Sequence, residues 1–512
     1  MRAGGSLASW FTFAFAILGI IFVAGFSSKV VENGNAWISD EKNSRFERYT
    51  YGQALYPDRW IIIDRDGYEW QPLSDEAYKD LLAMNSKEEA ADKIDSVYHA
   101  IYGQQFGLIQ QVNRDLYGVD GAYSGRKGIV DDGTEYYVYT SISGELSKKM
   151  LQALKAEGAR GIVMAQNYQT GEILASAQTP AVSVSEFKSD IYVSAHDPDY
   201  EKNNGWLLDQ SARWPYTPGS IQKIATTVAI NRNFALLDLP KDRSKTVLVC
   251  DGVYETPSGN ISCPYPHGPV SFNDAFAVSC NAFFAEQTIK LFSLEKAGKL
   301  ESKAANGSRK YIEICNELGY NKSYPYFNRL NTYKSAISIV NINISERSAG
   351  WLGAGQGLAG AELEVLPIHM LSLIGAIANR GQAKVPYAIM SEKTKSGQLV
   401  KQATTETMSA SHIKVGPDEA QDLDALMQQV CKGKGTAATL GTAMSAKGLT
   451  AAAKTGTAEV EQSSGKETIS WIIAYAKEVP LAFLACVYTP KTSGAATRIA
   501  ASMMPQAAEY LK

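Results

Sequence analysis

Cysteine and histidine are scarce in this sequence, which holds only 6 cysteines and 5 histidines among 512 residues. No two cysteines stand in a C-x-x-C spacing, and the histidines are scattered singly along the chain. Residues so few and so separated do not indicate a disulfide framework or a metal site, because both need clustered side chains. The sequence alone therefore predicts no metal and no cofactor.

Cys250 and Cys263 are the closest pair of cysteines along the chain. Outside a cell they could form a disulfide, but two free, buried thiols would leave the same pattern in the sequence. Both alternatives stay open at this level.

Charge of one sign is not in excess, since 50 basic residues face 53 acidic ones and the net charge is −3. A nucleic-acid binder needs a basic surface to neutralise phosphates, so nucleic acid is excluded as a partner. Internal repeats and low-complexity tracts are also missing from the sequence. With 45% hydrophobic residues over this length, the chain is expected to fold into two or three globular domains.

One long hydrophobic run lies near the N-terminus. Leu7 to Phe26 carries no charged residue over about twenty positions, the length that an α-helix needs to cross a bilayer. We interpret this run as an uncleaved transmembrane anchor; a cleaved signal peptide is the alternative, although no Ala-x-Ala site follows. Arg2 before the run and Lys29 after it do not decide which side of the membrane the rest of the chain occupies.

The residues after this run indicate a small domain. Trp60 to Ile63 has the composition of a buried strand, and Asp66-Gly67 supplies the turn that ends it. Glycine, serine and charged residues dominate from Gly121 to Gly133, which indicates a boundary just after Gly133. We therefore predict three parts: an anchor over residues 1–28, a pedestal domain over 29–133 and a main domain over 134–512.

The main domain begins and ends with segments that fit a single sheet. In chain order, the pattern predicts a helix over Leu146–Leu154, strands at Ile162–Ala165, Ile173–Ala175, Trp471–Tyr475 and Leu481–Tyr488, and a final helix over Arg498–Leu511. The first two strands flank a Gln-Thr-Gly turn and so predict a hairpin. We expect a sheet built from both ends of this domain and covered by its terminal helices.

Ser220 occupies the start of another predicted helix. It follows Pro218-Gly219 and precedes apolar residues at helical spacing, namely Ile221, Ile224, Ala225, Val228 and Ala229. Lys223 lies on the same face of this helix, where a neutral amine could take the proton of the serine hydroxyl. Burial beside the apolar residues would lower the pKa of the lysine and favour its neutral form.

A bare S-x-x-K pattern is weak evidence, because the sequence contains others that begin at Ser39, Ser124, Ser185, Ser293, Ser411 and Ser463. Only the pattern at Ser220 combines a Pro-Gly lead-in with a buried helix start. An ordinary helix-terminal serine beside a solvated lysine is the alternative interpretation.

A serine and an asparagine from an S-x-N pattern would complete such a site, one relaying protons and the other holding a substrate amide. The pattern occurs at Ser258, Ser271 and Ser279. The first is predicted to be a glycine turn and the second the cap of a helix beginning at Asp274. Ser279 and Asn281 lie among apolar residues, where polar groups need partners, so we select this pair.

The segment Lys454-Thr455-Gly456-Thr457 lies in a predicted edge strand. Gly456 leaves a gap at which another backbone can come close, so a peptide substrate could add there as a strand. Lys454, Thr455 and Thr457 would offer a cation and two hydroxyls to its carboxylate. A plain edge strand with a solvated lysine is the alternative, and the similar Lys395-Ser396-Gly397 is predicted to be a hairpin loop.

S-x-x-K, S-x-N and K-T-G, in this order and each in a fitting setting, form the active-serine signature of penicillin-recognising enzymes. The match extends to Tyr216-Thr217-Pro218-Gly219-Ser220, His267-Gly268-Pro269-Val270, Gly355-Gln356-Gly357, Ala378-Asn379-Arg380-Gly381 and Gly435-Thr436-Ala437. The sequence thus resembles class B penicillin-binding proteins, of the penicillin-binding protein A type, over most of residues 134–512. Trp60 departs from the glycine that is usual in the family's R-G-x-I-x-D-R-x-G segment, which leaves the subfamily open.

The resemblance implies an α/β (α+β) penicillin-binding transpeptidase fold, in which helices flank a central antiparallel sheet behind the transmembrane helix and the pedestal domain. It implies that Ser220 is the nucleophile and Lys223 its base, with Ser279 and Asn281 in proton relay and amide binding. Residues 454–457 would recognise the carboxylate. The backbone N–H groups of Ser220 and Thr457 would form the oxyanion hole.

The implied activity is that of a serine-type D,D-transpeptidase, which cross-links peptidoglycan stem peptides through an acyl-serine intermediate and is a target of β-lactam antibiotics. Its substrate, a glycan derived from lipid II, lies outside the cytoplasmic membrane, so the catalytic domain would be extracytoplasmic on a single-pass anchor. A membrane-embedded glycan polymerase of the SEDS family is the implied partner. A role in elongation, division or sporulation stays open.

Three other interpretations compete with this one. A bifunctional synthase would need a glycosyltransferase domain, for which the roughly one hundred residues between the anchor and Thr134 are too few. A secreted β-lactamase shares the three motifs but needs a base that activates water, and no E-x-x-L-N segment lies between Asn281 and Lys454. A non-catalytic scaffold or β-lactam sensor has no support, because Ser220, Lys223 and Ser279 are all present.

Overall fold

The computed structural model describes residues 60–67, 69–70, 136–179, 210–212, 214–302, 309–323, 325–326, 329–330, 334–339, 344–462, 465–489 and 494–512. The predicted transmembrane anchor and most of the predicted pedestal domain lie outside these residues. Within the described ranges, no helix is long and apolar enough to cross a membrane.

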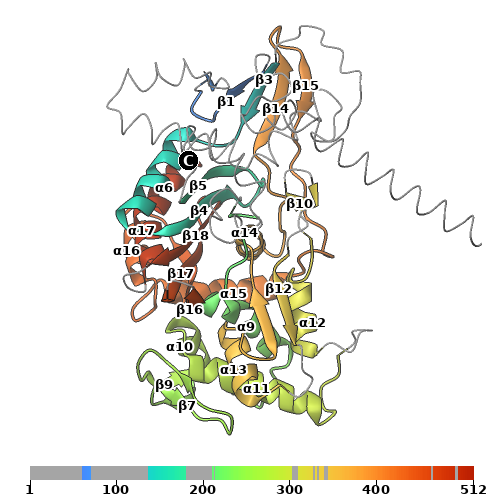
Figure 1. Cartoon of the computed structure of the whole chain (residues 1–512), viewed down its shortest axis with the longest axis vertical. Helices are drawn as coiled ribbons and strands as arrows, with labels where there is room; N and C mark the ends of the chain where they lie inside the picture. The colour runs from blue at the N-terminus through green and yellow to red at the C-terminus, as the bar shows by residue number, and fades with distance from the viewer. Residues whose placement is uncertain are drawn as a thin grey trace, which may run out of the picture.

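A five-stranded antiparallel sheet forms the centre of the molecule (Figure 1). Its strands, in spatial order, are β16 (Ala451–Gln462), β17 (Gly465–Ala476), β18 (Leu481–Thr489), β4 (Arg160–Asn167) and β5 (Ile173–Thr179). The predicted hairpin and the two predicted late strands are therefore confirmed. The pairing of β18 with β4 joins the two ends of the main domain in one sheet, as expected from the sequence.

Helices cover both faces of this sheet (Figure 1). On one face, α6 (Gly144–Ala156) and α17 (Ala495–Glu509) pack against each other and against the strands, which confirms the two predicted terminal helices. The side chain of Ser143 caps α6 by accepting a hydrogen bond from the N–H of Leu146. On the other face, the apolar helix α14 (Pro367–Ala378) packs against β4, β17 and β18.

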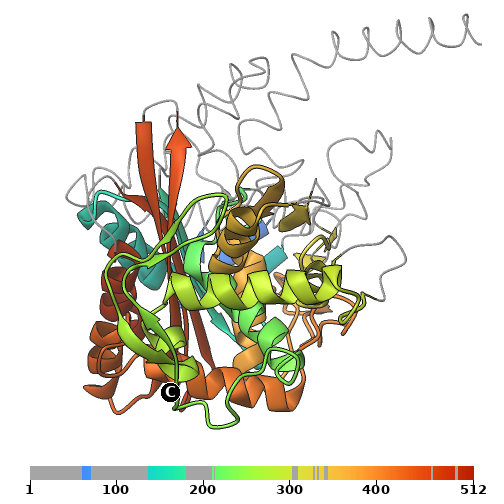
Figure 2. The same cartoon turned by 90° about the horizontal axis from the view of Figure 1, so that it is seen from below.

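The rest of the main domain is mostly helical and lies beyond the edge strand β16. Its helices are η4 (Gly219–Gln222), α9 (Lys223–Arg232), α10 (Phe272–Ala277), α11 (Asn281–Lys296), α12 (Lys310–Glu317), α13 (Glu346–Ala354) and α15 (Pro417–Val430). A further helix, α16 (Ala438–Ser445), packs instead against α17. Figure 2 shows α11, the long yellow-green helix, crossing this part of the molecule. The helices η4 and α15 contact β16 directly, so this region is held against the end of the central sheet.

Short two-stranded ribbons connect these helices. They pair β6 (Thr246–Cys250) with β9 (Gly268–Ser271), β7 (Val253–Tyr254) with β8 (Ile261–Ser262), β10 (Pro325–Tyr326) with β11 (Arg329–Leu330), and β12 (Ala336–Ile339) with β13 (Ala361–Glu364). Two of them, β6–β9 and β7–β8, belong to the chain between α9 and α10. They therefore lead directly into the segment that contains Ser279 and Asn281.

A second sheet combines strands from distant parts of the chain. Its order is β15 (Leu399–Gln402), β14 (Ile389–Thr394), β3 (Tyr136–Thr140), β1 (Trp60–Ile63) and β2 (Glu69–Trp70). β1 is the strand predicted at the start of the pedestal domain, and it pairs in parallel with β3 of the main domain. The sheet thus crosses the predicted boundary after Gly133. The turn between β14 and β15 confirms the hairpin loop predicted at Lys395-Ser396-Gly397.

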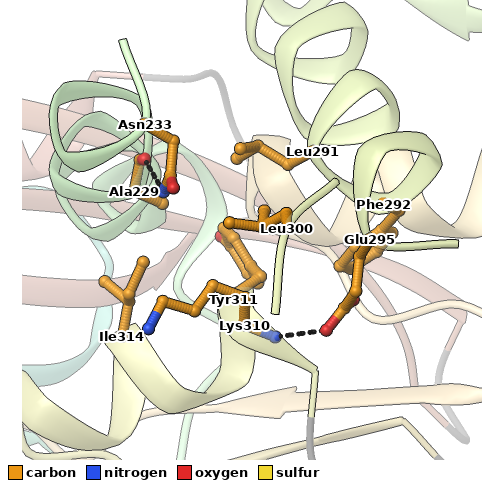
Figure 3. A pocket seen from close by; sticks show the side chains of 9 residues that line it. All are labelled: Ala229, Asn233, Leu291, Phe292, Glu295, Leu300, Lys310, Tyr311 and Ile314. Atoms are coloured by element: carbon orange, nitrogen blue, oxygen red, sulfur yellow. Dashed lines mark hydrogen bonds between the residues drawn. The ribbon is translucent and has the colours of Figure 1, made fainter. Parts of the chain in front are cut away.

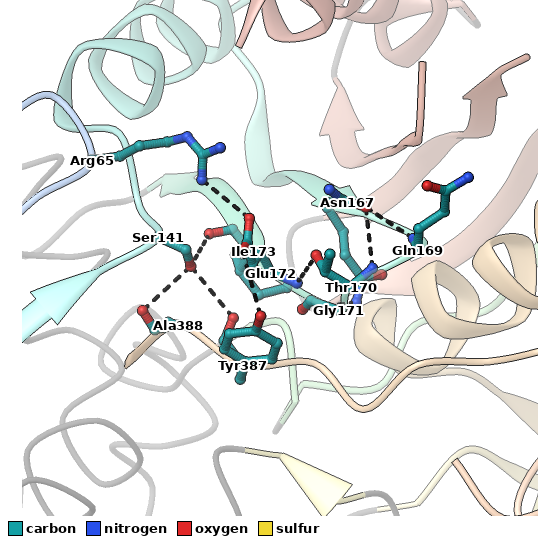
Figure 4. Close-up of polar contacts among 11 residues, drawn as sticks. Arg65, Ser141, Asn167, Gln169, Thr170, Gly171, Glu172, Ile173, Tyr387 and Ala388 are labelled. Atoms are coloured by element: carbon teal, nitrogen blue, oxygen red, sulfur yellow. Dashed lines mark hydrogen bonds and ion pairs between the residues drawn. The ribbon is translucent and has the colours of Figure 1, made fainter. Parts of the chain in front are cut away.

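Buried polar contacts join the two sheets (Figure 4). The hydroxyl of Ser141, directly after β3, lies 2.8 Å from the carbonyl oxygen of Ile173 in β5 and 3.3 Å from that of Ala388. Arg65, after β1, donates to the carboxylate of Glu172 at 3.2 Å. Ser141 is fully buried, so its hydroxyl provides these carbonyl oxygens with a hydrogen-bond partner where water cannot.

Candidate active site

Ser220 lies where the sequence predicts it, at the start of the helical segment formed by η4 and α9. The preceding Gly219 has φ +53°, and a Cβ atom on it would stand only 2.4 Å from the carbonyl oxygen of Thr457 in β16. A side chain at this position is therefore excluded by both the backbone conformation and the neighbouring strand. This contact brings the nucleophile candidate against the edge strand.

Gly355, at the end of α13, makes a second close backbone contact with the same helix start. Its φ is +113°, and a Cβ atom on it would lie 1.7 Å from the carbonyl oxygen of Gly219. The segment Gly355-Gln356-Gly357 matched the family pattern without a stated role. Its role in this structure is to let the end of α13 come close to the backbone that precedes Ser220.

Lys223 is fully buried, and its amine is surrounded by four polar atoms. Nζ lies 2.8 Å from the hydroxyl of Ser220, 2.7 Å from the carbonyl oxygen of Ser279, 3.1 Å from the hydroxyl of Ser279 and 2.6 Å from Oδ1 of Asn281. A neutral amine has two hydrogens and one lone pair. The carbonyl of Ser279 and the amide oxygen of Asn281 can accept the two hydrogens, which leaves the lone pair for the hydroxyl proton of Ser220.

Burial lowers the pKa of Lys223 from 10.5 to about 8, although the charges of Cys280 and Cys263 act in the opposite direction. The ring of Phe284 lies 5.5 Å from the amine and contributes to the apolar surroundings. Desolvation is the larger effect because no water reaches a fully buried ammonium group. A substantial share of the amine is therefore neutral near pH 8, as a general base requires.

Ser279 has an unusual backbone conformation for a residue other than glycine, with φ +61°. In this conformation its hydroxyl lies between two amines, 3.1 Å from Nζ of Lys223 and 2.9 Å from Nζ of Lys454. Asn281 is fixed by a 2.8 Å hydrogen bond from its amide nitrogen to the carbonyl oxygen of Ser262. That bond turns Oδ1 toward Lys223. The strained serine and the fixed amide are typical of a functional site.

The other two S-x-N patterns have the structural roles that the sequence predicts. Ser258 lies in a turn with Gly259, whose φ is +115°. Ser271 forms a capping box with Asp274, although the helix α10 begins at Phe272, two residues earlier than expected. Asp274 is the third residue of this helix and belongs to its capping box, so it does not mark the helix start.

The rival S-x-x-K patterns lie apart from this cluster wherever the structure describes them. The hydroxyl of Ser293 donates to the carbonyl oxygen of Ile289 inside α11, and Ser411 is an exposed turn residue bonded to Ser409. The remaining patterns, at Ser39, Ser124, Ser185 and Ser463, fall outside the described residues.

Lys454 lies in β16, at the edge of the central sheet, as predicted for the K-T-G segment. The alternative of a solvated lysine is wrong, because Lys454 is 0% exposed and donates to the hydroxyl of Ser279 at 2.9 Å. Burial, together with the charge of Lys223, holds the pKa of Lys454 well below its usual value. An incoming carboxylate would reverse this shift, because an opposite charge favours the ammonium form.

Another segment of this chain lies beside Gly456. A Cβ atom at Gly456 would lie 2.8 Å from the carbonyl oxygen of Pro218 and 3.1 Å from the side chain of Ile221. The backbone that comes close to Gly456 is thus the chain's own lead-in to Ser220. Thr455 is half-buried and Thr457 exposed, so their side chains remain on the accessible side of the strand.

Two residues that the sequence analysis did not select support this arrangement. The hydroxyl of Thr436 lies 2.5 Å from that of Thr455, which places the Gly435-Thr436-Ala437 motif beside the carboxylate-recognition candidates. Trp471 in β17 donates from its indole to the carbonyl oxygen of Thr217 at 2.9 Å. The match of Gly435-Thr436-Ala437 to the family pattern was the available signal for Thr436, whereas no local signal marked Trp471.

A pocket between α9, α11 and α12 lies away from this cluster (Figure 3). It is lined by Ala229, Asn233, Leu291, Phe292, Glu295, Leu300, Lys310, Tyr311 and Ile314. Ala229 and Asn233 follow Lys223 by six and ten residues in α9, which separates the pocket from the amine by roughly 9 Å or more along the helix. Neither Ser220 nor Lys223, Ser279 or Lys454 lines it, so the pocket is separate from the candidate catalytic cluster.

Residues that could hold a metal ion also meet next to the S-x-N segment. The ligand atoms of Cys250, Cys263, His267 and Cys280 all lie within 4.8 Å of one another. The sequence predicted no metal because no two cysteines stand in a C-x-x-C spacing and the histidines occur singly. The ribbons β6–β9 and β7–β8 bring them together in space.

Known proteins are similar to this chain over much of its length. The family model described as "Penicillin binding protein transpeptidase domain" matches residues 161–506. A curated relative, the peptidoglycan D,D-transpeptidase PbpA of Mycolicibacterium smegmatis, is 26% identical over 333 residues, which cover 62% of this chain and 59% of the relative. The chain thus matches less than two thirds of the length of that relative.

Solved structures agree on the fold. The D,D-transpeptidase domain of a peptidoglycan glycosyltransferase from Eggerthella lenta aligns with a TM-score of 0.61 at 20% identity, over 88% of this chain and 98% of that one. PBPA from Mycobacterium tuberculosis aligns with a TM-score of 0.57 at 19% identity, over 80% and 91%. Since the family model covers more than half of the sequence, this chain belongs to the penicillin-binding protein transpeptidase family.

Proposed function

We propose that this chain is a class B penicillin-binding protein, a serine-type D,D-transpeptidase that cross-links peptidoglycan stem peptides. The observation that carries the proposal is the set of contacts around Lys223: a fully buried amine 2.8 Å from the hydroxyl of Ser220 and within hydrogen-bond distance of Ser279 and Asn281. A nucleophile next to a base that other groups orient is the arrangement needed for acyl transfer.

In the first half of the reaction, neutral Lys223 takes the proton of Ser220 while the serine oxygen attacks the carbonyl carbon of the terminal D,D-peptide bond. The C–N bond then breaks, and the proton passes from Lys223 to the leaving amine through the hydroxyl of Ser279. The stem peptide is left as an ester on Ser220. The distances of 3.1 and 2.9 Å from the Ser279 hydroxyl to the two lysines suit this relay.

In the second half, the amino group of another stem peptide attacks the ester. Its proton returns through Ser279 and Lys223 to the serine oxygen as the C–O bond breaks, so Ser220 is regenerated and a new amide is formed. Before the C–N bond breaks in the first half, Lys454, Thr455 and Thr457 bind the terminal carboxylate of the first peptide, which then leaves with the released amine. The amide of Asn281 has a second hydrogen beyond the one given to Ser262, and this hydrogen binds a substrate carbonyl.

A β-lactam would enter the same reaction and stop after the first half. The M. tuberculosis PBPA is described as an acyl-enzyme complex with penicillin G, in a structure that aligns with a TM-score of 0.54. We expect penicillin to add one acyl group to this chain, detected by intact-protein mass spectrometry, and Ser220→Ala to abolish the adduct. Ser293→Ala, which alters another S-x-x-K serine in the described helix α11, should keep it.

An adduct that persists in Ser220→Ala would contradict the assignment of the nucleophile. The same protein should turn over nitrocefin slowly, because Lys223 and Ser279 are arranged to exchange protons with an amine acceptor. Turnover of many nitrocefin molecules per second would make the protein a β-lactamase and refute the proposal of a transpeptidase.

We further propose that the catalytic domain is extracytoplasmic on a single-pass anchor and acts with a SEDS-family glycan polymerase. The uncharged run from Leu7 to Phe26 and the resemblance to class B penicillin-binding proteins support this proposal. Replacing residues 7–133 by an unrelated anchor should abolish recovery of the polymerase in a pull-down, while penicillin still acylates the protein. Recovery of the polymerase by the replaced protein would place the docking surface elsewhere.

A further inference from the structure

Three cysteines and one histidine meet at the base of the segment that leads to Ser279. Cys250 ends β6, Cys263 follows β8, His267 precedes β9, and Cys280 caps α11. Cys250 and Cys280 are 1% and 0% exposed, and Cys263 is 9% exposed. Four potential ligands from four elements thus surround one point in the interior.

The spacing of these atoms fits a tetrahedral metal site. Sulfur atoms bound to zinc at about 2.3 Å stand roughly 3.8 Å apart in a tetrahedron, and a sulfur and an imidazole nitrogen roughly 3.5 Å apart. The measured separations are 3.7 Å from Cys250 to Cys263, 3.9 Å from Cys263 to Cys280, and 3.4 Å from Cys250 Sγ to Nδ1 of His267. These three separations match edges of a zinc-sized tetrahedron, and the remaining pairs of ligand atoms lie within 4.8 Å.

The same distances do not fit the disulfide that the sequence left open. A disulfide needs sulfur atoms about 2.05 Å apart. Cys250 and Cys263 are free thiols separated by 3.7 Å, and each has a further ligand within the cluster. Three soft thiolates and one imidazole in tetrahedral positions select zinc over calcium or magnesium, which prefer oxygen ligands in larger number.

We propose that Cys250, Cys263, His267 and Cys280 bind one structural zinc ion. Four protein ligands leave no open position for water, which distinguishes the site from a catalytic zinc. On binding, the three thiols release their protons to solvent and the imidazole binds in its neutral form. A hydrogen bond from the N–H of Ala282 to Cys263 Sγ, at 3.4 Å, supports a thiolate at this position.

The local fold explains why such a site is useful. The ribbons β6–β9 and β7–β8 have strands of two to five residues, and some of their large apolar side chains face solvent, with Val249 68% and Tyr265 54% exposed. Ribbons this short are marginal without a core of their own. The metal would cross-link both ribbons to the N-terminus of α11.

The proposed zinc site is also adjacent to the catalytic cluster along the chain. Cys280 is the central residue of Ser279-Cys280-Asn281, and Asn281 donates to the carbonyl oxygen of Ser262, next to Cys263. A zinc ion would thus hold Ser279 in its left-handed conformation and Asn281 toward Lys223. This consequence rests on the proposed function, whereas zinc binding does not depend on it.

The test is the metal content of the full chain, purified without chelators, by inductively coupled plasma mass spectrometry. We expect about one zinc per chain in the wild type and in Cys431→Ser, which alters a buried cysteine outside the cluster, and near zero in Cys250→Ser and His267→Ala. Zinc removal by a chelator should lower the melting temperature, and added Zn²⁺ should restore it. Added Co²⁺ should give the absorption bands of tetrahedral cobalt–thiolate in the wild type.

The proposal is overturned if the wild type binds no more zinc than Cys250→Ser, or if its intact mass shows that Cys250 and Cys263 have lost two hydrogens to a disulfide. Should the variants fail to fold, the cobalt spectrum and the chelator-dependent melting of the wild type still decide. Zinc binding with no acylation by penicillin would refute the proposed function alone. Acylation without zinc would refute this inference alone.

Discussion

At the scale of single residues, two buried lysines share one serine hydroxyl. Nζ of Lys223 and Nζ of Lys454 each lie within hydrogen-bond distance of the hydroxyl of Ser279, and both are fully buried. Burial lowers the pKa of both amines, and the charge of Lys223 lowers the pKa of Lys454 further. We infer that Lys223 works as the neutral partner and that Lys454 becomes charged when a carboxylate binds.

The pKa of Lys223, about 8, predicts how acylation by penicillin depends on pH. Below this value the amine is protonated and cannot accept the proton of Ser220, so the rate constant should rise about tenfold per pH unit and level off above about pH 8. Burial of the amine is the largest cause of this value, and the charges of Cys280 and Cys263 oppose it. Stopped-flow measurement of acylation from about pH 6 to 10 gives the profile.

The control for this profile is Lys223→Arg, in which the guanidinium stays protonated throughout this range. It should acylate slowly at every pH, without the rising limb. A wild-type rate that stays constant across the range, or that falls as pH rises, would show that Lys223 is not the base.

At the scale of elements, the site depends on the contact between a helix start and an edge strand. Gly219, at the helix start, lies against the backbone of Thr457 in the strand. Gly456, in the strand, lies against the carbonyl oxygen of Pro218, just before the helix. Neither η4 nor β16 carries the chemistry alone, because the serine belongs to one and the carboxylate-binding residues to the other. The two glycines therefore allow the helix start that carries Ser220 to lie close to the strand that carries Thr455 and Thr457.

We predict that Gly219→Ala lowers the acylation rate on the order of 100-fold, because a displacement of about 1 Å at a catalytic group has effects of this size. A Cβ atom at this position would stand 2.4 Å from the carbonyl oxygen of Thr457, so the helix start must move away from β16. The matched control is Gly158→Ala, since Gly158 has a similar φ of +61° but nothing within 4 Å of the added atom.

Gly158→Ala should cost about 1 kcal/mol of stability through its backbone conformation and leave acylation unchanged. The rate of acylation and the midpoint of urea unfolding, measured for both variants, separate the two effects. Equal acylation rates in the two variants would mean that the contact with Thr457 does not set the geometry.

At the scale of the whole molecule, two sheets are joined through buried polar groups and not through a flexible linker. Ser141 connects the sheet containing β3 and β14 to the central sheet, and Arg65 with Glu172 adds an ion pair at the same junction (Figure 4). Because β1 pairs with β3, the described part of the predicted pedestal domain is continuous with the main domain.

Removing the hydroxyl at this junction should destabilise the protein without affecting catalysis. We predict that Ser141→Ala lowers the free energy of unfolding by about 1–2 kcal/mol, because a fully buried hydrogen-bonding group is lost. Ser396→Ala, in the exposed turn between β14 and β15, should change it by less than about 0.5 kcal/mol. Urea titration of both variants measures the difference, and equal midpoints would contradict a role for Ser141 in joining the sheets.

The sequence by itself determined the local elements and the order of the motifs. Apolar periodicity located α6, α17 and four strands of the central sheet, because these patterns depend only on neighbouring residues. The spacing of Ser220 and Lys223 fixed their shared helix face, and the burial of Lys223 was expected from the apolar residues beside it. The choice of Ser279 over Ser258 and Ser271 rested on local surroundings of the same kind.

Only the tertiary structure decided what depends on residues far apart in sequence. The burial of Lys454 beneath Ser279, the use of Gly456 by Pro218 and the pairing of β1 with β3 have no local signature. The cysteine and histidine cluster is the clearest case, since its members look isolated until two ribbons fold the chain back on itself. Such sites arise from long-range pairing, which a pattern within a few residues cannot encode.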